Sequence, residues 1–281
     1  MLIPRIIHQT IPDKSTLDAL ATENIARMQE LNKGWVYNLY DDAQCRSFIV
    51  EHYGSDVFAY YERIHPPYGA ARADFFRYLL LYECGGVYLD IKSTMNRPLD
   101  TVLQENDSYL LSTWPNGPGT DYEGWGTHNN VDGVTDEYQQ WHVVAAPKHP
   151  FLEAVIKKVQ ANIDRYDPFV DGVGKNGVMK LTGPVAYTAA ITPIRALHPH
   201  RLVDVIGDLG FQYSIYPSTK TNKYGHVAKF ASHYSKRVDP IVTPKDRTIV
   251  TQCLVGALTT YRLGHRMTRN LLKRVLGRLM D

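Results

Sequence analysis

Features that would place a chain of 281 residues in several familiar classes are scarce in this sequence. Its three cysteines, Cys45, Cys84 and Cys253, are odd in number and widely separated, which excludes a disulfide framework and indicates free thiols in a reducing compartment. No stretch approaches the roughly 20 apolar residues that cross a bilayer, and the N-terminus lacks the apolar run of a signal peptide. We therefore expect a cytoplasmic protein, either free or attached to the inner face of a membrane.

Charge of one sign is also scarce, since the formal net charge at pH 7 is only +2. The excess of basic residues falls in residues 262–281, which hold six lysines and arginines and a single acid, so the rest of the chain is slightly acidic. A nucleic-acid-binding surface needs a basic face, and we therefore expect no nucleic-acid partner.

Residues 262–281 place apolar side chains on one helical arc and basic side chains on the opposite arc. This pattern is typical of a helix that lies on an anionic membrane surface. A terminal helix that docks on the globular part of the chain, with its charges in water, is the alternative. We expect one globular domain over residues 1–253 and a basic amphipathic helix over residues 254–281.

Short β-rich runs alternate with helical stretches in the first part of the chain. The sequence predicts strands over residues 3–8 and 35–40, a helix over 15–31 and a second helix from Asp42 towards His52. A third helix is expected over residues 68–83, followed by Gly85-Gly86 and a strand over 87–91. This alternation predicts an α/β fold with helices on both faces of a sheet.

The remainder of the chain is less regular. Residues 112–140 are rich in Gly, Pro, Asn and Asp, and they predict a long irregular region of the kind that often carries function. Asp132 and Gln140 are the polar residues in it that we select as candidates for catalysis, although polar loops are usually only solvated. A helix is expected over residues 150–163, and late strands over 213–216 and 227–233.

Four charged residues gather where the third helix gives way to the following strand. Asp74 and Arg77 are three residues apart and share a helix face, while Asp90 and Lys92 point to one side because strand side chains alternate. In open α/β sheets, ligands bind beyond the carboxyl ends of the strands. We therefore predict that these residues converge on one polar ligand, with a surface ion pair between Asp74 and Arg77 as the plain alternative.

This unit carries a resemblance to a known family. The matching runs are residues 71–78 (ARADFFRY), 85–90 (GGVYLD) and 97–100 (RPLD), with the opening residues 3–10 (IPRIIHQT). They resemble glycosyltransferase family 32, the DXD-motif sugar-binding family that includes yeast initiating mannosyltransferases and bacterial capsule enzymes. The resemblance implies a GT-A type fold with a mixed central sheet. It also implies a retaining transferase that moves a hexose from a UDP- or GDP-sugar to a saccharide or lipid-linked saccharide.

The resemblance further implies which residues bind the donor. Asp74 and Arg77 contact the donor sugar, while Tyr88 and Asp90 lie beside the ribose and the metal ion. The first strand lies beside the nucleotide. Arg72 is a further candidate, with an ion pair on the outside of its helix as the alternative. The donor-binding candidates are His8, Gln9, Thr10, Arg72, Asp74, Arg77, Tyr88 and Asp90.

The motif departs from the family pattern at one position. A DXD motif has a second Asp that binds a divalent metal, whereas this sequence has Asp90-Ile91-Lys92, and a charged lysine has no lone pair for a metal. Two interpretations stay open. Either the Lys92 ammonium neutralises the leaving diphosphate, or Asp90 holds Mn²⁺ or Mg²⁺ with a distant group such as His233. The catalytic candidates are Asp90, Lys92, Asp132 and Gln140, and the metal candidates are Asp90 and His233.

The altered motif leaves two other functions in view. One is a sugar-nucleotide-binding protein without activity. The other is a phosphohydrolase that acts on nucleotide sugars, which would need further carboxylates near Asp90. A dinucleotide-dependent enzyme is disfavoured, because no Gly-x-Gly-x-x-Gly follows the first strand.

Overall fold

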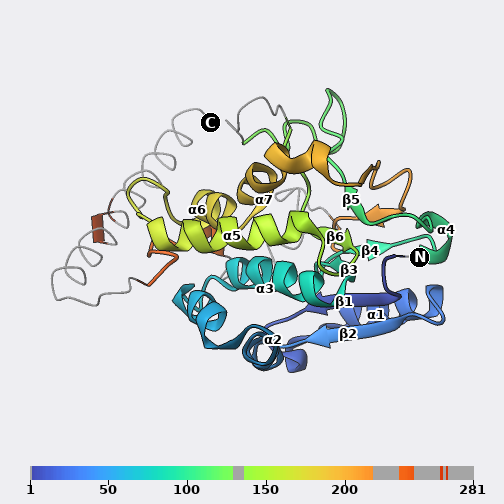
Figure 1. Cartoon of the computed structure of the whole chain (residues 1–281), viewed down its shortest axis with the longest axis horizontal. Coiled ribbons are helices and arrows are strands. Elements are labelled where there is room, and N and C mark those ends of the chain that lie inside the picture. The colour runs from blue at the N-terminus through green and yellow to red at the C-terminus, as the bar shows by residue number, and fades with distance from the viewer. Residues whose placement is uncertain (1, 129–135, 218–233, 244–259, 262–263, 265–281) are drawn as a thin grey trace, which may run out of the picture.

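The computed structural model describes residues 2–128, 136–217, 234–243, 260–261 and 264. At its centre is a six-stranded sheet in the order β2-β1-β3-β6-β5-β7 (Figure 1). The strands are β1 (Ile6–Thr10), β2 (Val36–Tyr40), β3 (Gly86–Leu89), β5 (Tyr109–Leu111), β6 (His142–Ala145) and β7 (Arg201–Leu202). A separate two-stranded sheet pairs β4 (Thr94–Met95) with β8 (Phe211–Gln212).

The strand directions confirm the predicted mixed sheet. β1 is parallel to both β2 and β3, and β5 is parallel to β7, whereas β6 runs antiparallel to both β3 and β5. Because β1 and β3 are parallel, with His8 opposite Tyr88, their carboxyl ends meet at one edge of the sheet. The residues after Leu89 therefore come to lie beside Thr10.

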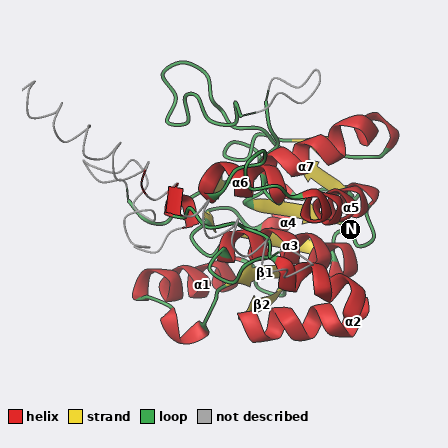
Figure 2. Ribbon diagram, turned by 90° about the vertical axis from the view of Figure 1, so that its left-hand side faces the viewer, coloured by secondary structure: helices red, strands yellow, loops and turns green. Residues whose placement is uncertain are grey.

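Helices cover both faces of the sheet, as the sequence predicts (Figure 2). One face packs against α2, α3, α5, α6 and α7, with Tyr88 and Val143 pointing into that core. The other face packs against α1 and α4, with Val87 and Val144 pointing the opposite way. The helices are α1 (Ala19–Leu31), α2 (Asp42–Arg63), α3 (Gly69–Cys84), α4 (Leu99–Val102), α5 (Pro150–Arg165), α6 (Gly174–Leu181) and α7 (Pro184–Ile191), with short 3₁₀ helices at Lys14–Thr16, Thr192–Leu197 and Tyr234–Lys236.

The connection between α3 and β3 depends on two glycines. Gly85 and Gly86 have φ angles of 63° and 102°, in the left-handed region that favours glycine. A Cβ atom on Gly85 would lie 2.7 Å from the backbone nitrogen of Pro147, and one on Gly86 would lie 2.6 Å from the carbonyl oxygen of Ile6. The tight turn packs α3 directly against β3, the strand that follows it. The position of Asp74 on the helix is therefore fixed relative to the end of β3.

Several expected boundaries differ from the observed ones. α2 begins at Asp42 as expected, and the structure adds a capping box between Asp41 and Gln44. The helix continues past His52 to Arg63, with a change of direction at Gly54. The first strand begins at Ile6, because Pro4 and Arg5 lie outside the ladder with β2.

The late strands differ more. The strand expected over residues 213–216 is wrong, because the paired residues are Phe211 and Gln212, which form the ladder with β4. The strand expected over 227–233 lies outside the described residues, as does most of the expected helix over 254–281. Within the described part of the chain, no helix is both long and apolar enough to cross a membrane.

Candidate functional site

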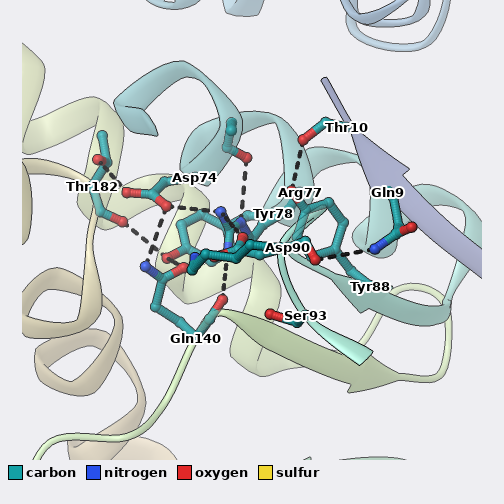
Figure 3. Close-up of polar contacts among 12 residues, drawn as sticks. Gln9, Thr10, Asp74, Arg77, Tyr78, Tyr88, Asp90, Ser93, Gln140 and Thr182 are labelled. Atoms are coloured by element: carbon teal, nitrogen blue, oxygen red, sulfur yellow. Dashed lines mark hydrogen bonds and ion pairs between the residues drawn. The ribbon is translucent and has the colours of Figure 1, made fainter. Parts of the chain in front are cut away.

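A buried arginine joins the two acids that the sequence singles out. Arg77 lies on α3 with 3% of its side chain exposed, and its Nη2 atom is 3.0 Å from Asp74 Oδ1 and 2.9 Å from Asp90 Oδ1 (Figure 3). Its guanidinium lies over the Tyr88 ring, with the carbon 4.5 Å from the ring centroid. A buried charge needs such partners, and the contacts confirm that the helix and the strand end converge.

Asp74 is held firmly from the side of the helix bundle. Its Oδ2 atom accepts a hydrogen bond of 3.0 Å from Thr182 Oγ1, and its Oδ1 atom accepts one of 3.2 Å from Gln140 Nε2. Burial raises the pKa of Asp74, while Arg77 acts in the opposite direction. The carboxylate is thus fixed in orientation by groups from three separate parts of the chain.

Asp90 and Lys92 lie in a turn that follows β3. The turn is closed by a hydrogen bond of 2.8 Å from the Ser93 amide to the Asp90 carbonyl. The Lys92 ammonium contacts Asp90 Oδ2 and lies 4.6 Å from the centroid of the Tyr213 ring. Burial is the largest single influence and works to lower the pKa of Lys92, but Asp90 and Tyr213 together outweigh it and the pKa is raised, so the lysine is charged. The predicted proximity is confirmed, although a turn brings it about and strand alternation does not.

The end of the first strand reaches the same place. Thr10 Oγ1 and the Tyr88 hydroxyl are 2.7 Å apart, and Gln9 Nε2 donates a hydrogen bond of 3.0 Å to the Asp90 carbonyl (Figure 3). The Gln9 side chain is fixed in turn by Tyr37, whose hydroxyl donates to Gln9 Oε1 at 2.7 Å. Burial raises the pKa of Tyr88 to about 12, so this phenol is neutral.

Two predicted donor-binding residues point elsewhere. His8 Nε2 contacts the Gly85 carbonyl oxygen at 3.1 Å inside the protein, and burial lowers the pKa of His8 to about 4. Arg72 Nε donates a hydrogen bond of 2.9 Å to the Ile64 carbonyl. Arg72 precedes Asp74 by two residues on α3, so the two side chains lie on nearly opposite sides of the helix. Of the other candidates, Gln140 joins the cluster, while Asp132 and His233 lie outside the described residues.

Three residues that sequence reasoning missed complete the cluster. Thr182 holds Asp74, Tyr213 underlies Lys92, and the Tyr78 hydroxyl donates to the Thr182 carbonyl at 2.9 Å and to Gln140 Oε1 at 3.2 Å. For Thr182, the available signal in the sequence was the run Thr182-Gly183-Pro184, which lies far from the motif. Tyr78 ends the run 71–78 that carries the family resemblance, which was the available signal for it, whereas nothing local to Tyr213 distinguishes it from a packing tyrosine.

The described residues do not supply a full set of ligands for the divalent cation that a DXD family generally uses. Among them, no group of three or more His, Cys, Asp or Glu side chains is placed to hold a metal ion. Both oxygens of Asp90 are contacted by cationic side chains, Arg77 on Oδ1 and Lys92 on Oδ2. Around Asp90, the donor set therefore fits an anion held by cations better than a metal ion held by acids.

Residues 12–109, which include α3, β3 and Asp90, match the family model of the glycosyltransferase sugar-binding region containing DXD motif. Over this segment the chain is similar to that family. The chain is 32% identical over 168 residues to inositol phosphoceramide mannosyltransferase 1 of Schizosaccharomyces pombe, covering 58% of this chain and 45% of that protein. It is 25% identical over 197 residues to the initiation-specific alpha-1,6-mannosyltransferase of the same yeast, covering 67% and 48%.

The chain thus spans about half the length of the curated relatives that it matches. Among solved structures, it resembles the PaToxG glycosyltransferase with a TM-score of 0.50 and 16% sequence identity, over 69% of this chain and 71% of that one. At this level of identity the likeness concerns the fold alone. It confirms the predicted GT-A type fold around the DXD-family region.

Proposed function

We propose that this chain is a retaining glycosyltransferase that moves a hexose from a UDP- or GDP-sugar to a hydroxyl group of a saccharide or lipid-linked saccharide. The observation that carries the proposal is the Arg77 bridge between Asp74 and Asp90 at the carboxyl end of β3. Ligands of α/β proteins bind at that edge. A preformed array of charges there suits a ligand that has both hydroxyl groups and a diphosphate.

The contacts suggest which residue binds each part of the nucleotide-sugar donor. Asp74, fixed by Thr182, is suited to order the end of the site that takes the sugar, since carboxylates accept hydrogen bonds from hydroxyl groups. Tyr88 is buried, with its hydroxyl against Thr10 and its ring under the Arg77 guanidinium, and the ribose is proposed to lie beside this end of the site. Lys92, which contacts Asp90 Oδ2 and keeps part of its side chain exposed, is suited to the diphosphate.

In the proposed reaction the bond between the sugar C1 atom and the diphosphate oxygen breaks, and its electron pair stays with the leaving diphosphate. The acceptor oxygen bonds to C1 on the same face, and its proton passes to the leaving phosphate. This course needs no base from the protein, so Asp74 and Asp90 act through charge and position. Positive charge aimed at the leaving oxygen contributes most to such catalysis.

That positive charge has two candidate sources. One is Mn²⁺ or Mg²⁺ held by Asp90 together with His233, and such an ion would neutralise the diphosphate as it leaves. The other is Lys92, whose ammonium already lies on Asp90. A metal titration of donor binding decides between them.

The acceptor side rests on the names of the relatives. One relative is named as a mannosyltransferase of inositol phosphoceramide, which supports a glycolipid or saccharide acceptor here. We place that acceptor against the region of residues 112–140, where Gln140 already contacts Asp74 and Asp132 is the further candidate.

Residues 254–281 are proposed as a helix that holds the catalytic domain, residues 1–253, at an anionic membrane surface. Deleting residues 262–281 should then release the protein from vesicles that contain anionic lipid, in a co-sedimentation assay, and leave donor binding unchanged. Equal sedimentation of the full and truncated chains would remove this part of the proposal.

The function is tested by incubating the chain with a panel of UDP- and GDP-hexoses and candidate glycolipid acceptors, and measuring transfer of labelled sugar. Asp90→Asn should abolish transfer, whereas Asp56→Asn, at an exposed position on α2, should not. Donor binding without turnover would instead indicate an inactive binding protein. Sugar release that is faster without acceptor than with it would indicate a phosphohydrolase.

A further inference from the structure

Asp90 and Lys92 stand where a DXD motif has two aspartates, and the net charge of the pair is more positive by two, which equals the charge of one divalent cation. Two aspartates carry two negative charges, whereas Asp90 and Lys92 together carry none. The neighbouring pair of Asp74 and Arg77 is also balanced, so among the described residues the cluster contains two acids and two cationic side chains. A balanced cluster lacks the net negative charge that attracts Mn²⁺ or Mg²⁺, and it already holds positive charge of its own.

Lys92 is built into the site. Its carbonyl accepts a hydrogen bond of 2.7 Å from the Ile215 amide, and the hydroxyl of the next residue, Ser93, donates to the Tyr213 carbonyl at 2.8 Å. These two bonds fix the segment that carries Tyr213 beneath the Lys92 ammonium. Only 16% of the lysine side chain is exposed. This arrangement disfavours the plain interpretation of a solvated surface charge.

The positions of the two cations around Asp90 differ in access. Arg77, on Oδ1, has 3% of its side chain exposed, whereas Lys92, on Oδ2, and Asp90 itself have 16% and 18% of their side chains exposed. A divalent ion bound to either oxygen would displace one of these cations and lie next to the other. Like charges repel strongly where little water screens them, so the geometry favours an anion at this place.

We infer that Lys92 replaces the divalent cation, and that its ammonium binds the diphosphate of the nucleotide donor without a metal ion. The inference rests on the donor site of the proposed function. An ammonium has three N–H donors, so one can remain on Asp90 while the others reach phosphate oxygens. Asp90 then serves as a positioning residue that orients Lys92, and the charge-assisted bonds to phosphate persist as the diphosphate leaves.

The first measurement uses the full chain and needs no substitution. The protein is treated with EDTA, and the binding of UDP and of GDP is measured by isothermal titration calorimetry in EDTA, in Mg²⁺ and in Mn²⁺. The nucleotide that binds should do so with a Kd that changes by less than about threefold among the three conditions. A Kd at least about tenfold weaker in EDTA would overturn the inference.

The second measurement restores the family motif. Lys92→Asp should weaken nucleotide binding in EDTA by at least about tenfold and recover it in Mn²⁺, because the pair again carries the charge that attracts a cation. Lys92→Met, which removes the charge without adding an acid, should bind weakly in every condition. Lys33→Asp reverses a lysine with 75% of its side chain exposed, and should behave as the unmodified chain. Melting curves without nucleotide establish that each variant is folded.

The outcomes separate this inference from the function on which it rests. Binding of neither UDP nor GDP in any condition, by the unmodified chain, would remove the proposed donor site and the inference together. Binding that requires Mn²⁺ or Mg²⁺ would keep the donor site and overturn the role of Lys92 alone. Metal-independent binding that Lys92→Met leaves unchanged would also overturn it.

Discussion

The Arg77 guanidinium and the Asp90 carboxylate are 2.9 Å apart, and this ion pair ties the middle of α3 to the turn after β3. The same nitrogen of Arg77 holds Asp74 at 3.0 Å, so one buried cation separates two acids that would otherwise face each other. The guanidinium carbon lies over the Tyr88 ring, 4.5 Å from its centroid, while the Nη2 atom reaches both carboxylates. The candidate site is therefore organised around a charge that the protein itself supplies.

Removing that charge should affect stability and activity together. Arg77→Met leaves the buried Asp74 without its cation and the partly buried Asp90 with Lys92 alone, and should lower the free energy of unfolding by about 3–5 kcal/mol. Arg77→Lys keeps the charge but loses the Nη1 contact with the Gln140 carbonyl and the planar packing on Tyr88. It should lower kcat/KM for transfer by at least about tenfold at a smaller cost in stability.

Urea unfolding and transfer kinetics measure the two effects of these Arg77 variants. Arg46→Lys, at a half-exposed ion pair with Glu62 on α2, is the control for changing an arginine away from the site. If Arg77→Met unfolds at the same urea concentration as the unmodified chain, the bridge does not hold the two acids in solution.

The hydroxyl of Thr182 should matter through Asp74. Thr182→Val is nearly isosteric but cannot donate to the buried Asp74 Oδ2, and should lower the free energy of unfolding by about 1–3 kcal/mol. Thr182→Ser keeps the hydroxyl and should recover most of that loss in the same urea titration. A serine variant as unstable as the valine variant would show that the methyl group, and not the hydrogen bond, is what counts.

The Gly85-Gly86 turn should tolerate no side chain. Gly85→Ala and Gly86→Ala each place a methyl group against backbone atoms within 2.7 Å, in addition to forcing an unfavourable φ angle. Gly34→Ala has a similarly positive φ of 91° but meets nothing within 4 Å, so it isolates the conformational cost of about 1 kcal/mol. Melting temperatures should fall far more for the two turn variants than for Gly34→Ala. Equal decreases would contradict the crowding.

Acid should destabilise the protein through His8. Burial lowers the pKa of His8 from 6.5 to about 4 in the folded state, so between these values the unfolded chain binds a proton that the folded chain does not. Stability is therefore present above pH 6.5 and is lost as the pH falls towards 4, by up to about 1.4 kcal/mol per pH unit. His8→Asn should show a shallower loss over this window in urea titrations, while His52→Asn, at an exposed position, should match the unmodified chain. Parallel curves for His8→Asn and the unmodified chain would mean that His8 titrates normally.

The local elements follow from residues that are close in sequence. Asp41-Asp42 predicts the start of α2, and Gly85-Gly86 predicts the end of α3, because caps and left-handed turns involve neighbouring residues. The three-residue spacing of Asp74 and Arg77 likewise predicts their contact on one helix face. Asp90 and Lys92 meet for the same reason, within a single turn.

The sequence by itself determined the identity of the charged residues, the order of the main elements and the lysine in the motif, since each is a matter of composition or short spacing. Only the tertiary structure decided that Thr182 reaches Asp74, that Tyr213 lies under Lys92, and that His8 and Arg72 turn away from the site. These contacts join segments that are distant along the chain. Their distances are fixed by how helices pack on the sheet, and no local pattern of residues specifies that packing.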